Sequence, residues 1–131
     1  MKYPLFIFIS ICLFACGDTR IKLADDYYVW STEGGSDMQI YYLAYGKYNI
    51  GMFGPRVYSV GVDSDFIIVK KHPVRDGKIN RQSTLFYIIP LKDRLSTEGE
   101  KNYFGPFYED GFLKKRHQLK VHPDLTFTIN F

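Results

Sequence analysis

The sequence predicts an α+β fold: a mostly antiparallel β-sheet, or a small β-sandwich, of about five to seven strands with one helix in the C-terminal half. Short aromatic and β-branched runs alternate with turn residues, as in strands joined by hairpins. Two runs, residues 66–69 and 85–89, are continuously apolar, which is typical of strands covered on both faces. Acidic residues followed by basic ones predict a helix over about residues 108–119.

The sequence of the N-terminal half of the domain predicts a hairpin followed by a loop. Residues 27–31 and 38–45 are rich in aromatic and β-branched side chains, and they flank a turn cluster that contains two glycines. Residues 46–55 hold three glycines and a proline, so they predict a loop. The next strand spans residues 57–62, and a turn at 63–65 joins it to the first apolar run.

The C-terminal half predicts a loop, the helix and a last strand. A polar loop spans residues 73–83 around the turn dipeptide Asp76-Gly77, and Pro90 ends the second apolar run because proline has no N–H to donate. The sequence His-Pro at 122–123 ends the helix. Apolar residues at 125, 127, 129 and 131 alternate with polar ones, which predicts a half-buried strand. The apolar stripe of the helix comprises Phe112, Leu113, the stem of Arg116 and Leu119.

The first residues have the pattern of an export signal. Lys2 precedes a continuous apolar run at residues 5–14, and residues 13–17 read Leu-Phe-Ala-Cys-Gly. This stretch resembles the leader and lipobox of bacterial lipoproteins. The resemblance implies that the sulfur of Cys16 receives a diacylglycerol, that the freed amine is acylated, commonly with palmitate, and that cleavage occurs before Cys16. Residues 1–15 are then the signal peptide, 16–26 the lipidated N-terminus and a short tether, and 27–131 a single β-rich domain.

Two other interpretations of the leader are weaker. A membrane-spanning helix needs about 20 apolar residues, and this run is about half as long. An ordinary signal cleaved after Gly17 also satisfies the small-residue rule, but it leaves the position of Cys16 unexplained. We therefore expect a lipid anchor in a bacterial cell membrane or outer membrane, with the domain outside the cytoplasm. The chain has two cysteines, Cys12 and Cys16, so the mature domain has no thiol left for a disulfide.

The order of motifs along the mature chain resembles a family of small bacterial lipoproteins that is uncharacterised. The matching segments are Cys16, Phe66 to Lys71, Phe86 to Pro90, and Gly105 to Arg116 with Leu119. The chain departs from the family pattern where Pro90 replaces an aspartate and Tyr108 replaces a helix-capping threonine. The resemblance implies a fold with a Gly-Pro-initiated helix and an envelope location, and it brings no catalytic residue.

The sequence predicts neither a cofactor nor a metal, and no catalytic residue. His117 and His122 are five positions apart, so they do not share a helix face as a zinc pair does, and His72 lies elsewhere. The acidic pairs at 25/26, 63/65, 98/100 and 109/110 have ordinary roles in turns, loops and a helix start. No nucleophile elbow or phosphate loop is present. The formal net charge of +3 is small and falls by one with the leader, which argues against a nucleic-acid partner.

Two groups of surface residues are candidates for binding. Aromatic side chains in the first strands, above all Trp30 and Tyr41, offer contact area to a protein or glycan, and one of each adjacent pair is expected to point outward. A basic group surrounds the 73–83 loop and suits anionic headgroups or an acidic partner: Lys70, Lys71, Arg75, Lys78 and Arg81. The alternatives are a core role for the aromatics and an ordinary solvated hairpin tip for the cations.

These observations predict a membrane-anchored bacterial lipoprotein with a binding or structural role at the cell envelope. One alternative is an immunity or inhibitor lipoprotein that captures a secreted toxin or hydrolase. Another is a hydrolase of envelope polymers, which requires a deep cleft with two converging carboxylates or a histidine–acid pair. An exposed aromatic row without such groups favours a binding role.

Overall fold

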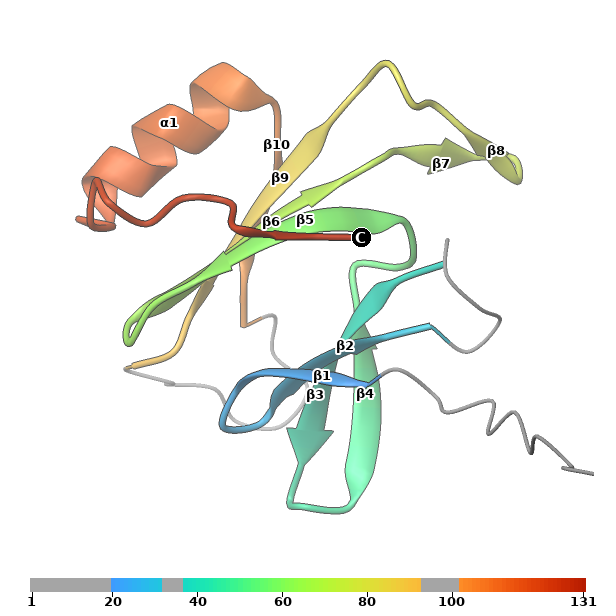
Figure 1. Ribbon diagram of the computed structural model, residues 1–131. Helices are drawn as coiled ribbons and strands as arrows, with labels where there is room; N and C mark the ends of the chain where they lie inside the picture. Colours follow the sequence, from blue (N-terminus) through green and yellow to red (C-terminus); the bar gives the residue numbers. More distant parts are fainter. Residues whose placement is uncertain (1–19, 32–36, 93–101) are drawn as a thin grey trace, which may run out of the picture.

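The computed structural model describes residues 20–31, 37–92 and 102–131. Within these residues, eleven strands and one helix form a four-stranded sheet, a five-stranded sheet and a small hairpin. Helix α1 lies on one side of the five-stranded sheet and the four-stranded sheet lies on the other (Figure 1). The predicted α+β class with mostly antiparallel strands is confirmed. The described strands outnumber the expected five to seven because several have only two to four residues, too few for a pattern of their own.

The four-stranded sheet is an antiparallel meander of β1 (Ile21–Ala24), β2 (Tyr27–Trp30), β3 (Gln39–Ala44) and β4 (Tyr48–Met52). The predicted hairpin of residues 27–31 and 38–45 is confirmed, because Tyr28 pairs with Tyr41 across β2 and β3. Two predictions are corrected. β1 lies within the residues expected to be a tether, and β4 lies within the expected loop 46–55, because both strands gain ladder hydrogen bonds from partners that local composition does not reveal.

The five-stranded sheet has the order β10-β9-β6-β5-β11 and is antiparallel throughout. Its strands are β10 (Phe104–Phe107), β9 (Leu85–Pro90), β6 (Phe66–Lys71), β5 (Val57–Val62) and β11 (Ile129–Asn130). The two continuous apolar runs are β6 and β9, and they are neighbours at the centre of the sheet. Pro90 is the last residue of β9, as predicted.

Both faces of β6 and β9 are buried, which confirms the expectation for these runs. Ile67 and Ile89 belong to an apolar cluster between the two sheets, whereas Ile68 and Ile88 belong to a second cluster under α1. All four are fully buried, and each contributes about 1.5–3 kcal/mol relative to an exposed side chain. The second cluster is completed by Phe86, Phe112, Val121 and Leu125. The molecule therefore has three layers, and the outer face of the four-stranded sheet is the side farthest from α1.

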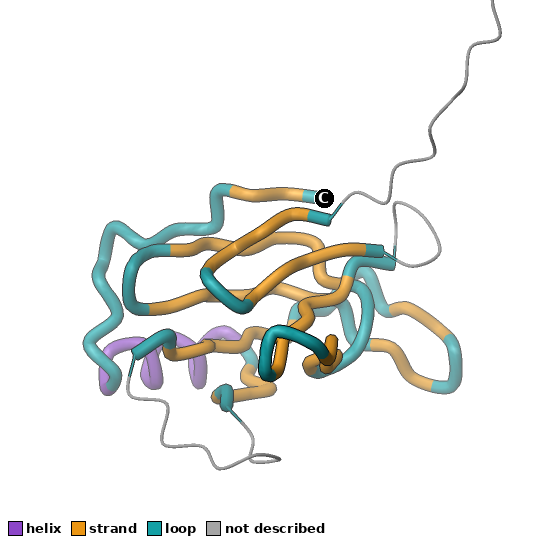
Figure 2. Tube along the Cα trace, turned by 90° about the horizontal axis from the view of Figure 1, so that it is seen from below, coloured by secondary structure: helices purple, strands orange, loops and turns teal. Residues whose placement is uncertain are grey.

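Helix α1 spans Glu109–Gln118, close to the predicted 108–119, and in Figure 2 it is the single helix (purple) beside the strands. Phe112 is buried. The side chain of Arg116 donates from Nη2 to two carbonyl oxygens beyond the helix end, those of His122 at 2.8 Å and Leu125 at 2.6 Å. Leu113 was expected on the apolar stripe, but it is 52% exposed because the helix packs along the line of Phe112 and Leu119. No described helix has the length and apolar content needed to cross a bilayer.

The helix ends before the His-Pro sequence that was expected to stop it. Lys120 has a left-handed backbone with φ of 56°. Its N–H bonds the carbonyl of His117 at 3.1 Å, and the N–H of Val121 bonds that of Arg116 at 3.0 Å. This pair of bonds is a Schellman motif, which satisfies carbonyls left over at the helix end.

The C-terminal segment is a strand only at β11, which corrects the expected strand over 125–131. Leu125 and Phe127 pack on the α1 side of the five-stranded sheet instead of extending its edge. The carbonyl of Thr126 lies so close to Gly61 that a Cβ there would overlap it. The chain then reaches the edge of β5, where the N–H of Thr128 bonds the carbonyl of Val60 at 3.1 Å.

The predicted loop 73–83 contains a small hairpin of β7 (Val74–Arg75) and β8 (Lys78–Ile79). Its turn is the Asp76-Gly77 dipeptide singled out from the sequence, and both residues have positive φ, of 51° and 72°. This is the type I′ geometry that fits the twist of a two-residue hairpin. The hairpin extends away from the body of the sheets (Figure 1).

Candidate functional site

The outer face of the four-stranded sheet carries the aromatic residues that the sequence singled out. Tyr27 and Val29 of β2 point into the core, so Tyr28 and Trp30 point outward. On β3, Tyr42 packs against the inner cluster and Tyr41 lies on the outer side, which confirms that one of each pair points outward. We call this surface the aromatic face and define it by Arg20, Lys22, Tyr28, Trp30 and Tyr41.

Trp30 lies between two partners on the aromatic face. Its ring stacks on Tyr41 with centroids 4.1 Å apart and an interplanar angle of 18°. The guanidinium carbon of Arg20 lies 4.1 Å from the Trp30 centroid and 5.4 Å from that of Tyr28. Two groups this close to one ring cannot share a side, so Tyr41 and Arg20 cover opposite faces of Trp30. Stacking and cation–π contacts of this kind each contribute about 0.5–1.5 kcal/mol.

A glycine shapes the edge of the aromatic face. Gly51 of β4 pairs with Tyr41, and a Cβ at this position would overlap the side-chain amide of Gln39. The missing side chain lets Gln39 lie beside the Tyr41 ring, with Gln39 Oε1 3.5 Å from the Tyr41 hydroxyl. Sequence reasoning missed Arg20 and Tyr28 as members of this face. Alternation along β2 was the available signal for Tyr28, whereas Arg20 required the tertiary structure.

The structure separates the five basic residues that were grouped from the sequence. Arg75, Lys78 and Arg81 are exposed on or beside the β7–β8 hairpin. Lys70 lies on the α1 side of the five-stranded sheet, with its ammonium 4.3 Å from the centroid of the Phe127 ring. Lys71 is only 6% exposed, so it is not part of any binding surface and this assignment was wrong. The physical reason is that neighbouring residues of a strand point to opposite faces.

Lys71 has a structural partner inside the molecule. Its Nζ donates to the carbonyl oxygen of Phe53 at 2.5 Å, and burial lowers the pKa of the ammonium. The bonded carbonyl belongs to a sharp loop in which Phe53, Gly54 and Arg56 all have positive φ. Lys71 therefore fixes the chain where it passes from one sheet to the other.

The histidines are dispersed, as expected from their spacing. His72 stacks on Tyr58 with centroids 4.3 Å apart, and its Nδ1 lies 3.0 Å from the carbonyl oxygen of Ser83. His122 Nδ1 accepts from the N–H of Asp124 at 3.1 Å, and His117 is exposed on α1. Across residues 20–31, 37–92 and 102–131, no three His, Cys, Asp or Glu side chains gather as metal ligands.

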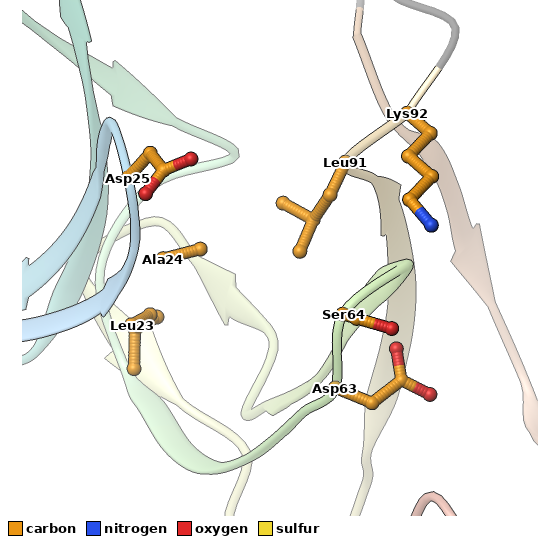
Figure 3. Close-up of a pocket in the computed structure, with 7 residues that line it drawn as sticks. All are labelled: Leu23, Ala24, Asp25, Asp63, Ser64, Leu91 and Lys92. Carbon is orange, nitrogen blue, oxygen red and sulfur yellow. The ribbon is translucent and has the colours of Figure 1, made fainter.

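A shallow groove of about 340 Å³ lies where turns of the two sheets meet (Figure 3). In Figure 3, Asp25 lies across the groove from Asp63 and Ser64, and the side chain of Leu91 extends between them. One oxygen of Asp63 accepts the N–H groups of Asp65 and Phe66, both at 2.8 Å, so it fixes its own turn. The groove is lined by Leu23, Ala24, Asp25, Asp63, Ser64, Leu91 and Lys92.

The groove does not have the features that the hydrolase alternative requires. Its carboxylates lie on opposite walls and no histidine lines it. The other carboxylate of the turn, Asp65, forms an ion pair with Lys92 at 2.6 Å. Of the remaining acidic pairs, Glu109 and Asp110 are exposed in the first turn of α1, and the pair at 98/100 lies outside the described residues. Cys16 also lies outside them.

Comparison with known proteins places the domain in a family. A family model described as a protein of unknown function (DUF3997) matches residues 24–129, which is most of the chain. No curated protein and no solved structure matches the chain. The expectation of an uncharacterised family is confirmed, and the match covers β2 to β10 and α1 and ends at the first residue of β11. The chain therefore belongs to the DUF3997 family of proteins of unknown function.

Proposed function

We propose that this chain is a lipoprotein of the bacterial cell envelope, anchored through acyl chains on Cys16, and that its domain acts by binding at the membrane surface. The observation that carries the proposal is the sequence Leu-Phe-Ala-Cys-Gly at residues 13–17, at the end of an apolar run that follows Lys2. Two or three acyl chains hold a protein durably, whereas one holds it only weakly.

The family match lies wholly after the proposed cleavage site. All described strands and the helix lie between Ile21 and Asn130, and the family match begins at residue 24. Removal of residues 1–15 therefore leaves the matched region intact. β1 begins five positions after Cys16, so a lipid on that residue leaves the sheet only a short segment from the bilayer.

The aromatic face supports binding rather than catalysis as the role of the domain. It combines half-buried Tyr28, Trp30 and Tyr41 with the exposed cations Arg20 and Lys22, and no described element packs over it. Large aromatic side chains supply contact area at a low entropic cost. In contrast, Asp63 accepts the backbone N–H groups of its own turn, and Asp65 forms an ion pair with Lys92.

Mass spectrometry of the protein purified from membranes of its bacterial host tests the anchor. We expect a chain that begins at Cys16 and carries the added mass of a diacylglycerol and an amide-linked acyl group. Radioactive palmitate is expected to label the wild type and Cys12→Ser but not Cys16→Ser, and the two variants differ only in which cysteine is removed. An uncleaved leader, or a free sulfhydryl at Cys16, refutes the proposal.

A further inference from the structure

We propose that the aromatic face is the side of the domain that lies against the bilayer, where Arg20 and Lys22 contact the phosphates of anionic phospholipid headgroups. The inference rests on the proposed anchor at Cys16 and specifies what the face binds. Three observations carry it: the length of chain between the anchor and the face, the charge of the face, and the way its rings are stacked.

The chain between the anchor and the aromatic face is short. Arg20 lies four positions after Cys16, and an extended chain spans at most about 3.3–3.6 Å per residue, so the two Cα atoms are at most about 14 Å apart. The Arg20 guanidinium is in contact with the ring of Trp30, 4.1 Å from its centroid. A lipid on Cys16 holds that residue at the bilayer surface, so the aromatic face is the part of the described domain that is held nearest to the headgroups.

The charge of the face suits an anionic surface. Arg20 and Lys22 are both exposed, and each basic residue near such a surface raises partitioning about five-fold, which corresponds to about 1 kcal/mol. One carboxylate, Asp18, precedes Arg20 by two positions and lies outside the described residues, so residues 17–22 carry a net charge of +1. Among the described residues, the nearest carboxylates along the chain are Asp25 and Asp26, in the turn at the other end of β1. At about 3.3 Å per residue they are about 15 Å or more from Arg20, beyond the Debye length of about 8 Å at physiological salt.

The stacking on the face favours headgroups over a glycan. A sugar ring binds by stacking on a free aromatic face, but Tyr41 and Arg20 occupy both faces of Trp30. Trp30 therefore presents its ring edge, next to a guanidinium held in place by two aromatic contacts. Tyr and Trp are enriched at the membrane–water interface because one part of each ring is apolar and the other polar. A guanidinium forms paired hydrogen bonds with phosphate oxygens.

Because the domain is tethered to the membrane, a weak interaction with the headgroups is sufficient to hold the aromatic face against the bilayer. A domain held by a short linker experiences an effective concentration of its target of about millimolar. Two cations together raise partitioning about 30-fold, and the one negative charge of Asp18 offsets about five-fold of this gain. Because the tether supplies the high effective concentration, the anchored domain lies mostly against an anionic bilayer even though the isolated domain binds it weakly.

The single tryptophan of the chain is the probe for this inference, since Trp30 is itself on the aromatic face. The purified lipoprotein is reconstituted in vesicles of phosphatidylcholine, with or without phosphatidylglycerol, and Trp30 fluorescence is recorded. With phosphatidylglycerol we expect emission to shift to the blue, iodide to lose access, and a headgroup nitroxide lipid to quench. Salt at about 1 M, where the Debye length is about 3 Å, is expected to reverse these changes.

Two charge-matched double variants locate the contact. Arg20→Gln with Lys22→Gln is expected to abolish the response to phosphatidylglycerol, whereas Arg75→Gln with Lys78→Gln, on the β7–β8 hairpin, leaves it unchanged. Because Arg20 contacts Trp30, each variant is compared with its own spectrum in pure phosphatidylcholine vesicles. Equal Trp30 exposure in both vesicle types, or a response lost only in the hairpin variant, overturns the inference.

Failure of the anchor and failure of the docking are distinguishable. Mass spectrometry that shows no acyl chain on Cys16 refutes the proposed function, and the docking falls with it. An acylated protein whose Trp30 stays accessible on anionic vesicles refutes the docking alone. In that case the aromatic face is free for a protein partner, and the lipoprotein assignment stands.

Discussion

Gly61 offers a sharp test of how the C-terminal segment packs. The segment crosses the five-stranded sheet directly over Gly61, whose backbone is not left-handed, so alanine is conformationally acceptable there. The alanine Cβ would overlap the carbonyl oxygen of Thr126 and lie 2.9 Å from its carbonyl carbon and 3.0 Å from Cγ1 of Ile68. Optimal separations are about 3.5–4.0 Å, so the segment has to move by about 1 Å.

The expected cost follows from what the movement disturbs. Overpacking in a well-packed region costs about 1–3 kcal/mol. The displaced segment carries Leu125, which is 5% exposed and whose burial contributes about 1.5–3 kcal/mol, so partial loss of its packing gives a similar figure. We expect Gly61→Ala to lower the free energy of unfolding by about 2 kcal/mol, which corresponds to a fall in Tm of about 8 °C.

The same substitution at Gly111 is the matched control. Gly111 lies in α1, and the nearest atom to an added Cβ is Cδ1 of Phe107 at 3.4 Å, which is ordinary contact. Because glycine is about 1 kcal/mol worse than alanine inside a helix, Gly111→Ala is expected to raise stability by up to about 1 kcal/mol. Urea denaturation of residues 17–131, followed by circular dichroism, measures both changes. A neutral or stabilising Gly61→Ala would show that the segment does not lie over the sheet.

Three further predictions concern single side chains. Arg116→Met removes the bonds to the carbonyls beyond the helix and is expected to cost about 2 kcal/mol in urea denaturation, whereas Lys114→Met, on the exposed side of α1, changes stability by less than about 0.5 kcal/mol. Lys120→Gly removes the steric strain of a side chain on a left-handed backbone, so we expect the free energy of unfolding to rise by about 1 kcal/mol and Tm to rise with it. A lower Tm contradicts the Schellman assignment. Burial, together with the nearby Tyr103 phenol, raises the pKa of Tyr87 from 10.0 to about 12. As pH rises, the unfolded state therefore loses the Tyr87 proton before the folded state does. The free energy of unfolding is expected to fall between about pH 10 and 12, by up to about 3 kcal/mol. Tyr87→Phe should flatten this alkaline fall in a pH series of urea titrations, and Tyr48→Phe, at a 64% exposed site, should leave it intact.

Deprotonation of Lys71 is expected to raise the free energy of unfolding with increasing pH, opposite to the effect of Tyr87 and at slightly lower pH. Burial lowers the pKa of its ammonium below 10.5, so between the folded pKa and 10.5 the unfolded state binds more protons. This term makes stability rise as pH increases toward 10.5, after which the Tyr87 term dominates. The alkaline profile of the wild type therefore combines a gain from one buried group with a loss from another.

The aromatic face shows which side-chain directions can be predicted from the alternation of residues along a strand. Alternation along a strand requires Tyr41 and Tyr42 to point to opposite sides, and this was predictable from adjacent positions alone. Which of the two faces the core depends on the pairing of Tyr28 with Tyr41 and on the sheet that packs against Tyr42. The position of Arg20 over Trp30 depends on the path of β1 beside β2, which no local pattern contains.

The basic residues show a prediction that the sequence could have refined. Lys70 and Lys71 are adjacent in a strand, so they cannot belong to one surface, and grouping them ignored the period of two. That Lys71 points between the sheets and bonds Phe53, however, follows only from how the two sheets meet. The three glycines and the proline of residues 46–55 predict a loop, whereas β4 is a strand because β3 supplies its hydrogen bonds.

The sequence by itself determined the α+β class, the β2–β3 hairpin, the double burial of β6 and β9, the helix and the turn at Asp76-Gly77. Each of these follows from interactions within a few residues: side-chain alternation, continuous apolar runs, charge order along a helix, and glycine at positive φ. Only the tertiary structure decided that Arg20 joins the aromatic face, that Lys71 is buried, and that the C-terminal segment crosses Gly61. These outcomes depend on contacts between residues far apart in the chain, and their energies are set by which layers pack together.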